Sequence, residues 1–96
     1  MYEEIIEAYV KRTFYDPYSL RDVSISQPIQ GHILSQQGWI VCFEANAKNR
    51  MGGYVGIQRG AYLINRDSVV QTWANAPLCN DTRFQYSPLP ELEQVQ

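Results

Sequence analysis

Apolar side chains recur at three- and four-residue steps over the first fourteen residues, which predicts an amphipathic helix. Ile6, Tyr9 and Val10 lie in the centre of this apolar stripe. Glutamates lie toward the start of the segment and basic residues toward its end, the order that the helix dipole favours. We expect the helix to stop at Asp16-Pro17, because a residue before proline avoids the helical conformation.

Beyond this Asp-Pro pair, strand-like patterns replace the helical period. The four predicted strands are a segment that begins at residue 21 and is ended by Pro28, and residues 39–47, 54–64 and 68–74. The second is almost continuously apolar from Trp39 to Phe43, so we expect it to be central. Residues 65–67 (NRD) predict a hairpin turn, whereas the polar, glycine-bounded segment 30–38 predicts a loop.

These elements predict an α+β fold, with an N-terminal helix packed on an antiparallel meander of about four strands. A chain of 96 residues is expected to form one domain, which we place at residues 1–87. Pro77, Pro88 and Pro90 disfavour a further regular strand. Residues 88–96 therefore predict a flexible C-terminal tail.

Composition and charge narrow the function classes. The apolar share of 45% and charged share of 19% are ordinary for a globular domain. A formal net charge of −2 gives no broad attraction for nucleic acid, so we expect no nucleic-acid partner. No apolar run approaches the roughly 20 residues that span a bilayer. The sequence starts abruptly inside a helix pattern, which suggests that an export segment or N-terminal membrane anchor has been removed.

The segment 46–56, NAKNRMGGYVG, joins two predicted strands and has two interpretations. Gly52 and Gly53 permit the positive φ of a tight turn, so a plain hairpin explains them. Gly56 lies inside a strand, where glycine indicates a bulge or a close backbone approach. A recognition loop is the alternative, because Lys48 exceeds what a turn needs. The candidate binding residues are Asn46, Lys48, Asn49, Arg50 and Tyr54.

The two cysteines also leave two possibilities. Cys42 lies in the middle of the central strand, and Cys79 lies in the segment that must return across the sheet. A disulfide between them would close a long loop and favour an oxidising compartment. The alternative is a pair of buried, reduced thiols in a cytosolic protein.

Two motifs resemble an uncharacterised group of small bacterial exported proteins and lipoproteins. The first is a DPxS turn, here Asp16, Pro17 and Ser19, and the second is NAKNxxGGYxG, here from Asn46 to Gly56. The group commonly has Cys-Gly-Glu in the middle strand, where this chain has Phe at the glycine position. The resemblance covers less than half of the chain and implies a periplasmic or lipid-anchored, non-enzymatic domain.

Catalytic and metal-binding patterns are missing from the sequence. His32 is the sole histidine, and no Cys-x-x-Cys or Gly-x-Ser-x-Gly motif accompanies it. We therefore expect no enzyme activity, no metal and no cofactor. The expected function is protein binding in the bacterial cell envelope. An inhibitor or immunity protein, using the 46–54 hairpin against a hydrolase such as a lysozyme, is the alternative.

Overall fold

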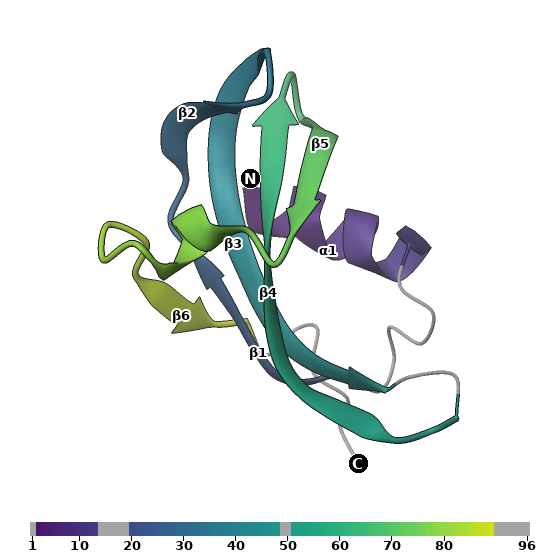
Figure 1. Ribbon diagram of the computed structural model, residues 1–96. Helices are drawn as coiled ribbons and strands as arrows, with labels where there is room; N and C mark the ends of the chain where they lie inside the picture. The colour runs from purple at the N-terminus through teal and green to yellow at the C-terminus, as the bar shows by residue number, and fades with distance from the viewer. Residues whose placement is uncertain (1, 14–19, 49–50, 90–96) are drawn as a thin grey trace.

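One helix lies against one face of a six-stranded antiparallel sheet in this computed structural model, which describes residues 2–13, 20–48 and 51–89 apart from the side chain of Val55 (Figure 1). The elements are α1 (Tyr2–Thr13), β1 (Arg21–Ser26), β2 (Ile29–Ile33), β3 (Gln36–Lys48), β4 (Tyr54–Asn65), β5 (Ser68–Ala74), the 3₁₀ helix η2 (Pro77–Asn80) and β6 (Tyr86–Pro88). The α+β prediction is confirmed, but six strands replace the expected four.

The long strand β3 organises the sheet. The strand order is β5-β4-β3-β1-β6, so β3 lies in the middle as predicted. Its first half pairs with β2, from Ile29↔Ile40 to Ile33↔Gln36, and its second half pairs with β1. The two short strands β1 and β2 thus share one edge of β3 in succession.

The prediction of a loop at residues 30–38 was wrong, because these residues form most of β2, the turn after it and the start of β3. Ile33 is buried and Ile29 is half-buried, while the residues between them are polar or glycine. Gln, His and Gly are weak strand formers, so propensity alone favours a loop here. Pairing with a buried central strand overrides that weak preference. The turn passes through Leu34, which has a φ of 57° and is largely exposed.

The C-terminal segment also forms a strand that the sequence did not predict. Tyr86 to Pro88 pairs with β1, and the backbone N–H of Leu89 donates to the carbonyl oxygen of Val23 over 2.9 Å. Leu89 is buried in the core beside α1. Proline is tolerated in this edge strand because its missing donor can face away from the ladder. Residues 88 and 89 therefore belong to the packed chain, whereas residues 90–96 lie outside the described residues.

The core between α1 and the sheet contains the apolar stripe that the sequence predicted for the helix. Ile6 and Val10 are fully buried and pack in one cluster with residues of β1, β3 and β4, including Phe43 and Tyr62. The Phe43 and Tyr62 rings stack with centroids 5.7 Å apart, and Tyr9 approaches Tyr62 edge-on at 5.2 Å. The helix is described to Thr13, so the predicted stop at Asp16-Pro17 lies outside the described residues.

Burial raises the pKa of Tyr62 well above its ordinary value, and the neighbouring Tyr9 adds to the effect. The unfolded chain releases this proton near pH 10, whereas the folded protein retains it. The stabilising contribution is therefore complete below pH 10 and is lost as the pH rises above it. We expect the free energy of unfolding to fall by about 1.4 kcal/mol per pH unit for this proton. Urea unfolding between pH 9 and 11 should show a shallower loss in Tyr62→Phe; identical slopes would contradict the assignment.

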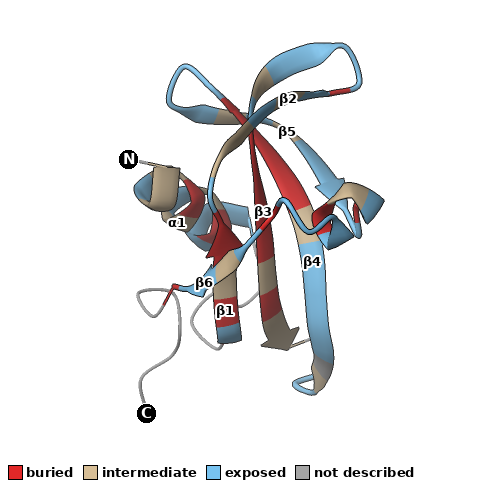
Figure 2. Ribbon diagram, turned by 90° about the vertical axis from the view of Figure 1, so that its left-hand side faces the viewer, coloured by how far each residue is buried: buried red, intermediate tan, exposed pale blue. Residues whose placement is uncertain are grey.

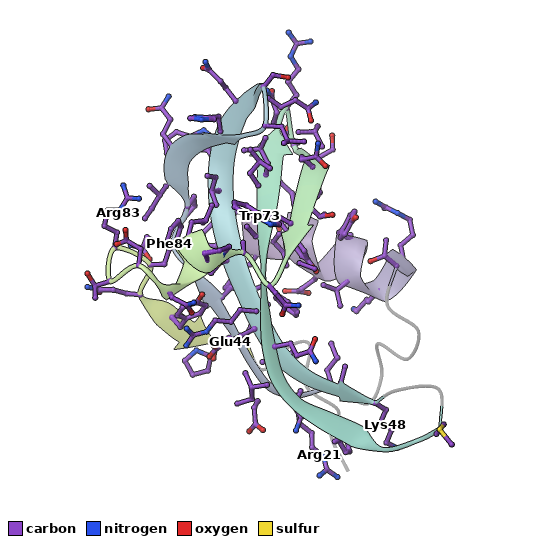
Figure 3. The ribbon with its side chains drawn as sticks, in the orientation of Figure 1. Arg21, Glu44, Lys48, Trp73, Arg83 and Phe84 are labelled. Atoms are coloured by element: carbon purple, nitrogen blue, oxygen red, sulfur yellow. A yellow bond between two sulfur atoms is a disulfide. The ribbon has the colours of Figure 1, made fainter. Side chains whose placement is uncertain are left out.

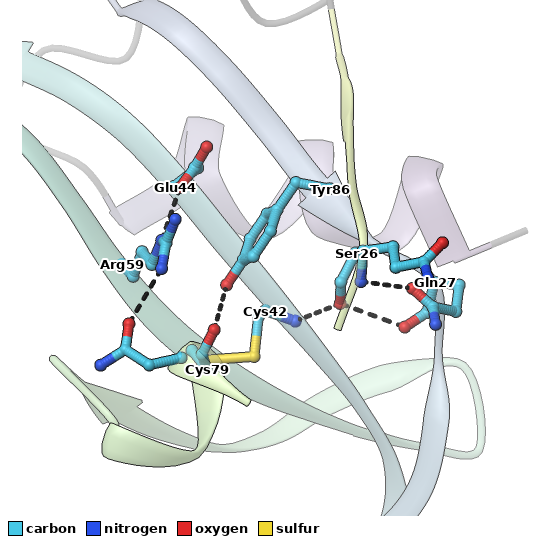
Figure 4. Close-up of a disulfide and its surroundings, with 9 residues drawn as sticks. Ser26, Gln27, Cys42, Glu44, Arg59, Cys79 and Tyr86 are labelled. Atoms are coloured by element: carbon cyan, nitrogen blue, oxygen red, sulfur yellow. Dashed lines mark hydrogen bonds and ion pairs between the residues drawn. A yellow bond between two sulfur atoms is a disulfide. The ribbon is translucent and has the colours of Figure 1, made fainter. Parts of the chain in front are cut away.

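A second core covers the opposite face of the sheet. Burial colouring shows buried residues along β3 and β4 and beneath the η2 segment (Figure 2). The Cys42–Cys79 disulfide joins β3 to η2 with a Cα separation of 5.7 Å, which confirms the predicted bond. Both cysteines are at most 1% exposed. Beside the disulfide, the backbone N–H of Cys42 donates to Ser26 Oγ over 2.9 Å (Figure 4).

The described part of the chain contains no helix with the length and apolar character needed to cross a bilayer. A buried disulfide is compatible with an oxidising extracellular compartment.

Candidate functional site

Beyond Asn46, which pairs with the first residue of β1, strands β3 and β4 continue as a twisted two-stranded arm (Figure 1). The arm includes the end of β3 from Asn46 and the start of β4 up to Ile57, together with the described part of their connection. Most described residues of the connection and of this part of β4 are exposed (Figure 2). The candidate binding segment therefore projects away from both cores.

A bulge at Gly56 shapes this arm. Asn46 pairs with Ile57 and Lys48 pairs with Tyr54, so two residues of β4 oppose a single residue of β3. Gly56 has a φ of 94°, and its N–H donates to Asn46 Oδ1 over 3.0 Å. A Cβ at Gly56 would meet nothing within 4 Å. The sequence prediction of a bulge is confirmed, while the alternative of a close backbone approach was wrong.

Two cations approach one aromatic ring on the arm. Lys48 Nζ lies 5.6 Å and Arg21 Cζ lies 4.2 Å from the centre of the Tyr54 ring. Figure 3 places Arg21 and Lys48 at the arm end of the molecule. Cation–π contacts of this kind contribute about 0.5–1 kcal/mol at exposed sites. They orient the two charges on the sheet face that lies opposite α1.

Large apolar side chains are exposed close to these cations. Met51 in the connection is 93% exposed, and Ile57 on β4 is 56% exposed. Ile57 pairs with Asn46 and therefore shares its face with the Lys48–Tyr54 pair. We call Arg21, Lys48, Met51, Tyr54 and Ile57 the arm surface.

The cations of the arm surface differ from the cation at the base of the arm in whether they form an ion pair. Among the described residues, neither Arg21 nor Lys48 has a carboxylate within ion-pair distance. At the base, Arg59 Nε donates to Glu44 Oε2 over 2.6 Å and its terminal nitrogen donates to Asn80 Oδ1 over 2.9 Å. Arg59 is thus already paired, whereas the arm cations are available for an acidic partner.

Arg59 also connects the arm to the disulfide segment. Its Cζ lies 4.7 Å from the centre of the Tyr86 ring, whose hydroxyl donates to the Cys79 carbonyl oxygen over 3.0 Å (Figure 4). Burial raises the pKa of Tyr86, although Arg59 opposes this effect, so the hydroxyl remains a donor at neutral pH. We infer that these contacts of Arg59 and Tyr86 stabilise the base of the arm.

The structure brings together three of the five predicted binding residues. Asn46, Lys48 and Tyr54 share one face of the arm, although Asn46 also holds the bulge. Gly52 has the expected positive φ of 84°, whereas Gly53 does not. Four predicted site residues lie outside the described residues: Asp16, Pro17, Asn49 and Arg50.

Sequence reasoning missed three members of the arm surface. Arg21 lies on another strand, and only the β1–β3 pairing Arg21↔Asn46 brings it to the arm. Met51 offered a signal, because a methionine between Arg50 and Gly52 is unusual in a polar turn. Ile57 follows the bulge, which changes the face on which the strand alternation would place it.

The arm surface can stack through Tyr54, make apolar contacts through Met51 and Ile57, and bind carboxylates through Arg21 and Lys48. Within residues 2–13, 20–48 and 51–89, no group of three His, Cys, Asp or Glu side chains could hold a metal ion. His32 is exposed on β2, away from the arm.

No family model, curated protein or solved structure matches the chain, so the resemblance to small exported proteins stays a prediction and the arm geometry carries the functional argument.

Proposed function

We propose that this chain is a non-catalytic domain of the bacterial cell envelope, periplasmic or lipid-anchored, which binds another protein through the arm surface. The single observation that carries the proposal is the exposure of Met51 and Ile57 beside the Arg21–Tyr54–Lys48 stack.

The composition of the arm surface supports binding to a protein. Arginine, tyrosine and methionine are enriched in protein interfaces, and arginine and tyrosine are frequent among their energetic hot spots. The two cations are held against one ring, so less side-chain freedom is lost when they bind. An acidic patch with an apolar centre on the partner is the matching chemistry.

The envelope location rests on the disulfide and on the sequence resemblance. A bond between two fully buried cysteines is typical of proteins that fold outside the cytosol. In such a compartment the domain would meet its partner at a membrane or cell-wall surface.

A narrower form of this function is inhibition of a hydrolase. The arm is only two strands wide, and Met51 in its connection is almost fully exposed. An element of this shape could enter a cleft, where Lys48 would meet the acidic groups of a hydrolase such as a lysozyme. Inhibition of an isolated partner's activity would distinguish this form from simple attachment.

The Lys48→Ala variant tests the proposal. We expect its free energy of unfolding to change by no more than about 1 kcal/mol, because the lysine contributes one exposed cation–π contact. Binding should weaken by about 2 kcal/mol, roughly thirtyfold, if the ammonium group is desolvated against a carboxylate. A pull-down from envelope extract, followed by titration with the purified partner, measures both the partner set and the loss.

Lys11→Ala is the matched control, because Lys11 is an exposed lysine on α1 and lies outside the arm. This variant should retain wild-type binding. If Lys48→Ala keeps every specific partner at wild-type affinity, the arm is a structural hairpin and the proposal fails. Met51→Ser provides a second test, since loss of the exposed thioether should weaken the same complex without affecting either core.

A further inference from the structure

A groove opens between α1 and the sheet, on the face opposite the arm surface. It encloses about 320 Å³ and is lined by the end of α1 and by β3, β4 and β5. Cavities that take small molecules have volumes of about 300 to 1,000 Å³, so this groove lies at the lower limit.

Small residues in adjacent strands leave the space that forms the groove. Gly60 on β4 pairs with Phe43 on one side and with Ala74 on the other, and Ala45 lies two residues beyond Phe43 on the same face of β3. All four residues line the groove. Phe43 supplies a ring at one side, while the glycine and the alanines leave the space beside it unfilled.

The Tyr62 hydroxyl is the distinctive polar group of the groove. Tyr62 lines the groove and is only 7% exposed, and within the described part of the chain its hydroxyl makes no hydrogen bond. Every fully buried side-chain nitrogen or oxygen among the described residues does have a partner. The unpartnered Tyr62 hydroxyl therefore retains some exposed surface, and we infer that it faces the groove that Tyr62 lines. Its raised pKa keeps it a neutral donor.

Charged side chains do not converge on this hydroxyl. Arg59 borders the groove, but its guanidinium group pairs with Glu44 on the opposite face of the sheet. The remaining polar lining residues carry only hydroxyl or amide groups: Tyr9, Thr13, Gln58, Thr72 and Asn75. An uncharged ligand therefore fits the groove better than an ion.

We propose that the groove binds a small, uncharged aromatic molecule with a carbonyl or similar hydrogen-bond acceptor. The ligand's ring packs among Tyr9, Phe43 and Tyr62, whose own stacked and edge-on geometry suits a further aromatic ring. Its acceptor accepts a hydrogen bond from the Tyr62 hydroxyl, which makes none within the described part of the chain. This site is independent of the arm surface and of the proposed protein partner.

Prodan, an uncharged naphthalene ketone whose fluorescence reports polarity and hydrogen bonding to its carbonyl, is a suitable probe. We expect saturable binding to the disulfide-bonded wild-type protein, with emission shifted to the blue relative to water. Tyr62→Phe should weaken binding roughly tenfold, as expected for one lost hydrogen bond, and shift the bound emission further to the blue. The variant should fold normally, because no protein group loses a partner.

Two further variants make the test decisive. Tyr86→Phe removes a tyrosine hydroxyl from the opposite face and should bind prodan like the wild type. Ala74→Trp places a large ring over the groove from an exposed edge-strand position and should abolish binding. Circular dichroism verifies that each variant is folded. Absence of saturable binding by the wild type, or wild-type affinity in either Tyr62→Phe or Ala74→Trp, overturns the proposal.

Discussion

Loss of the Cys42–Cys79 disulfide is expected to lower the free energy of unfolding by about 4 kcal/mol, the chain-entropy estimate for its sequence separation of 37 residues. Domains of this size have total stabilities of about 5 to 15 kcal/mol, so the loss removes a large share. The bond also ties η2 to the sheet, and η2 with its flanking residues supplies Ala76, Cys79 and Phe84 to the second core. We therefore expect the reduced protein to be barely folded at 37 °C.

Urea unfolding of the oxidised protein and of the Cys42→Ala/Cys79→Ala variant measures this loss. Tyr86→Phe serves as a control for local damage, because it removes only the hydrogen bond to the Cys79 carbonyl, worth about 1 kcal/mol. Intact mass without reductant should show the wild type lighter by two hydrogens than the dithiol. Two titratable thiols in the native protein, or equal stability of the double variant, would contradict the assignment.

Elements with a strong period or a continuous apolar run were predictable from the sequence. The α1 stripe placed Ile6 and Val10 in the core, and the central strand and the 68–74 strand were identified close to their observed bounds. The 65–67 turn was also correct, with Asn65 paired with Ser68 across it. In each case the local pattern and the tertiary environment favour the same structure.

Strands that form only because they pair with a neighbouring strand could not be predicted from the sequence. The β2 segment has weak strand formers, and β6 contains a proline, so neither has a strong local preference. Both form because β3 and β1 offer unpaired backbone groups at their edges. Such pairing is a property of the assembled sheet, and a single sequence does not reveal it.

Only the part of the candidate site that lies on β3 and β4 could be predicted from the sequence. The segment from Asn46 to Gly56 indicated a hairpin, and of the two explanations for Gly56, a bulge or a close backbone approach, the structure shows the bulge. Arg21 joins it through the register between β1 and β3, which also contains an irregularity between Arg21 and Ser24. The groove was missed because its small residues, such as Gly60 and Ala74, become neighbours only when β4 pairs with β5.

Replacement of Gly56 is expected to give the second-largest loss of stability. Its φ of 94° lies in a region that glycine adopts readily and a β-branched residue avoids. Because a Cβ would meet nothing within 4 Å, the cost is backbone strain alone. We expect Gly56→Val to lower the free energy of unfolding by about 1 to 3 kcal/mol, despite the higher strand propensity of valine.

Gly60 provides the matched control on the same strand. Gly60 has no positive φ, and an added Cβ would make ordinary contacts at 3.6 and 3.9 Å. Gly60→Ala should therefore be near neutral, whereas Gly56→Ala should lower the melting temperature by roughly 4–8 °C for each kcal/mol of strain. Asn46→Ala should reproduce part of the Gly56 effect, because it removes the acceptor of the Gly56 N–H. An unchanged melting temperature in both Gly56 variants would show that the arm adopts an unbulged register in solution, and Lys48 and Tyr54 would then no longer be paired as the arm surface requires.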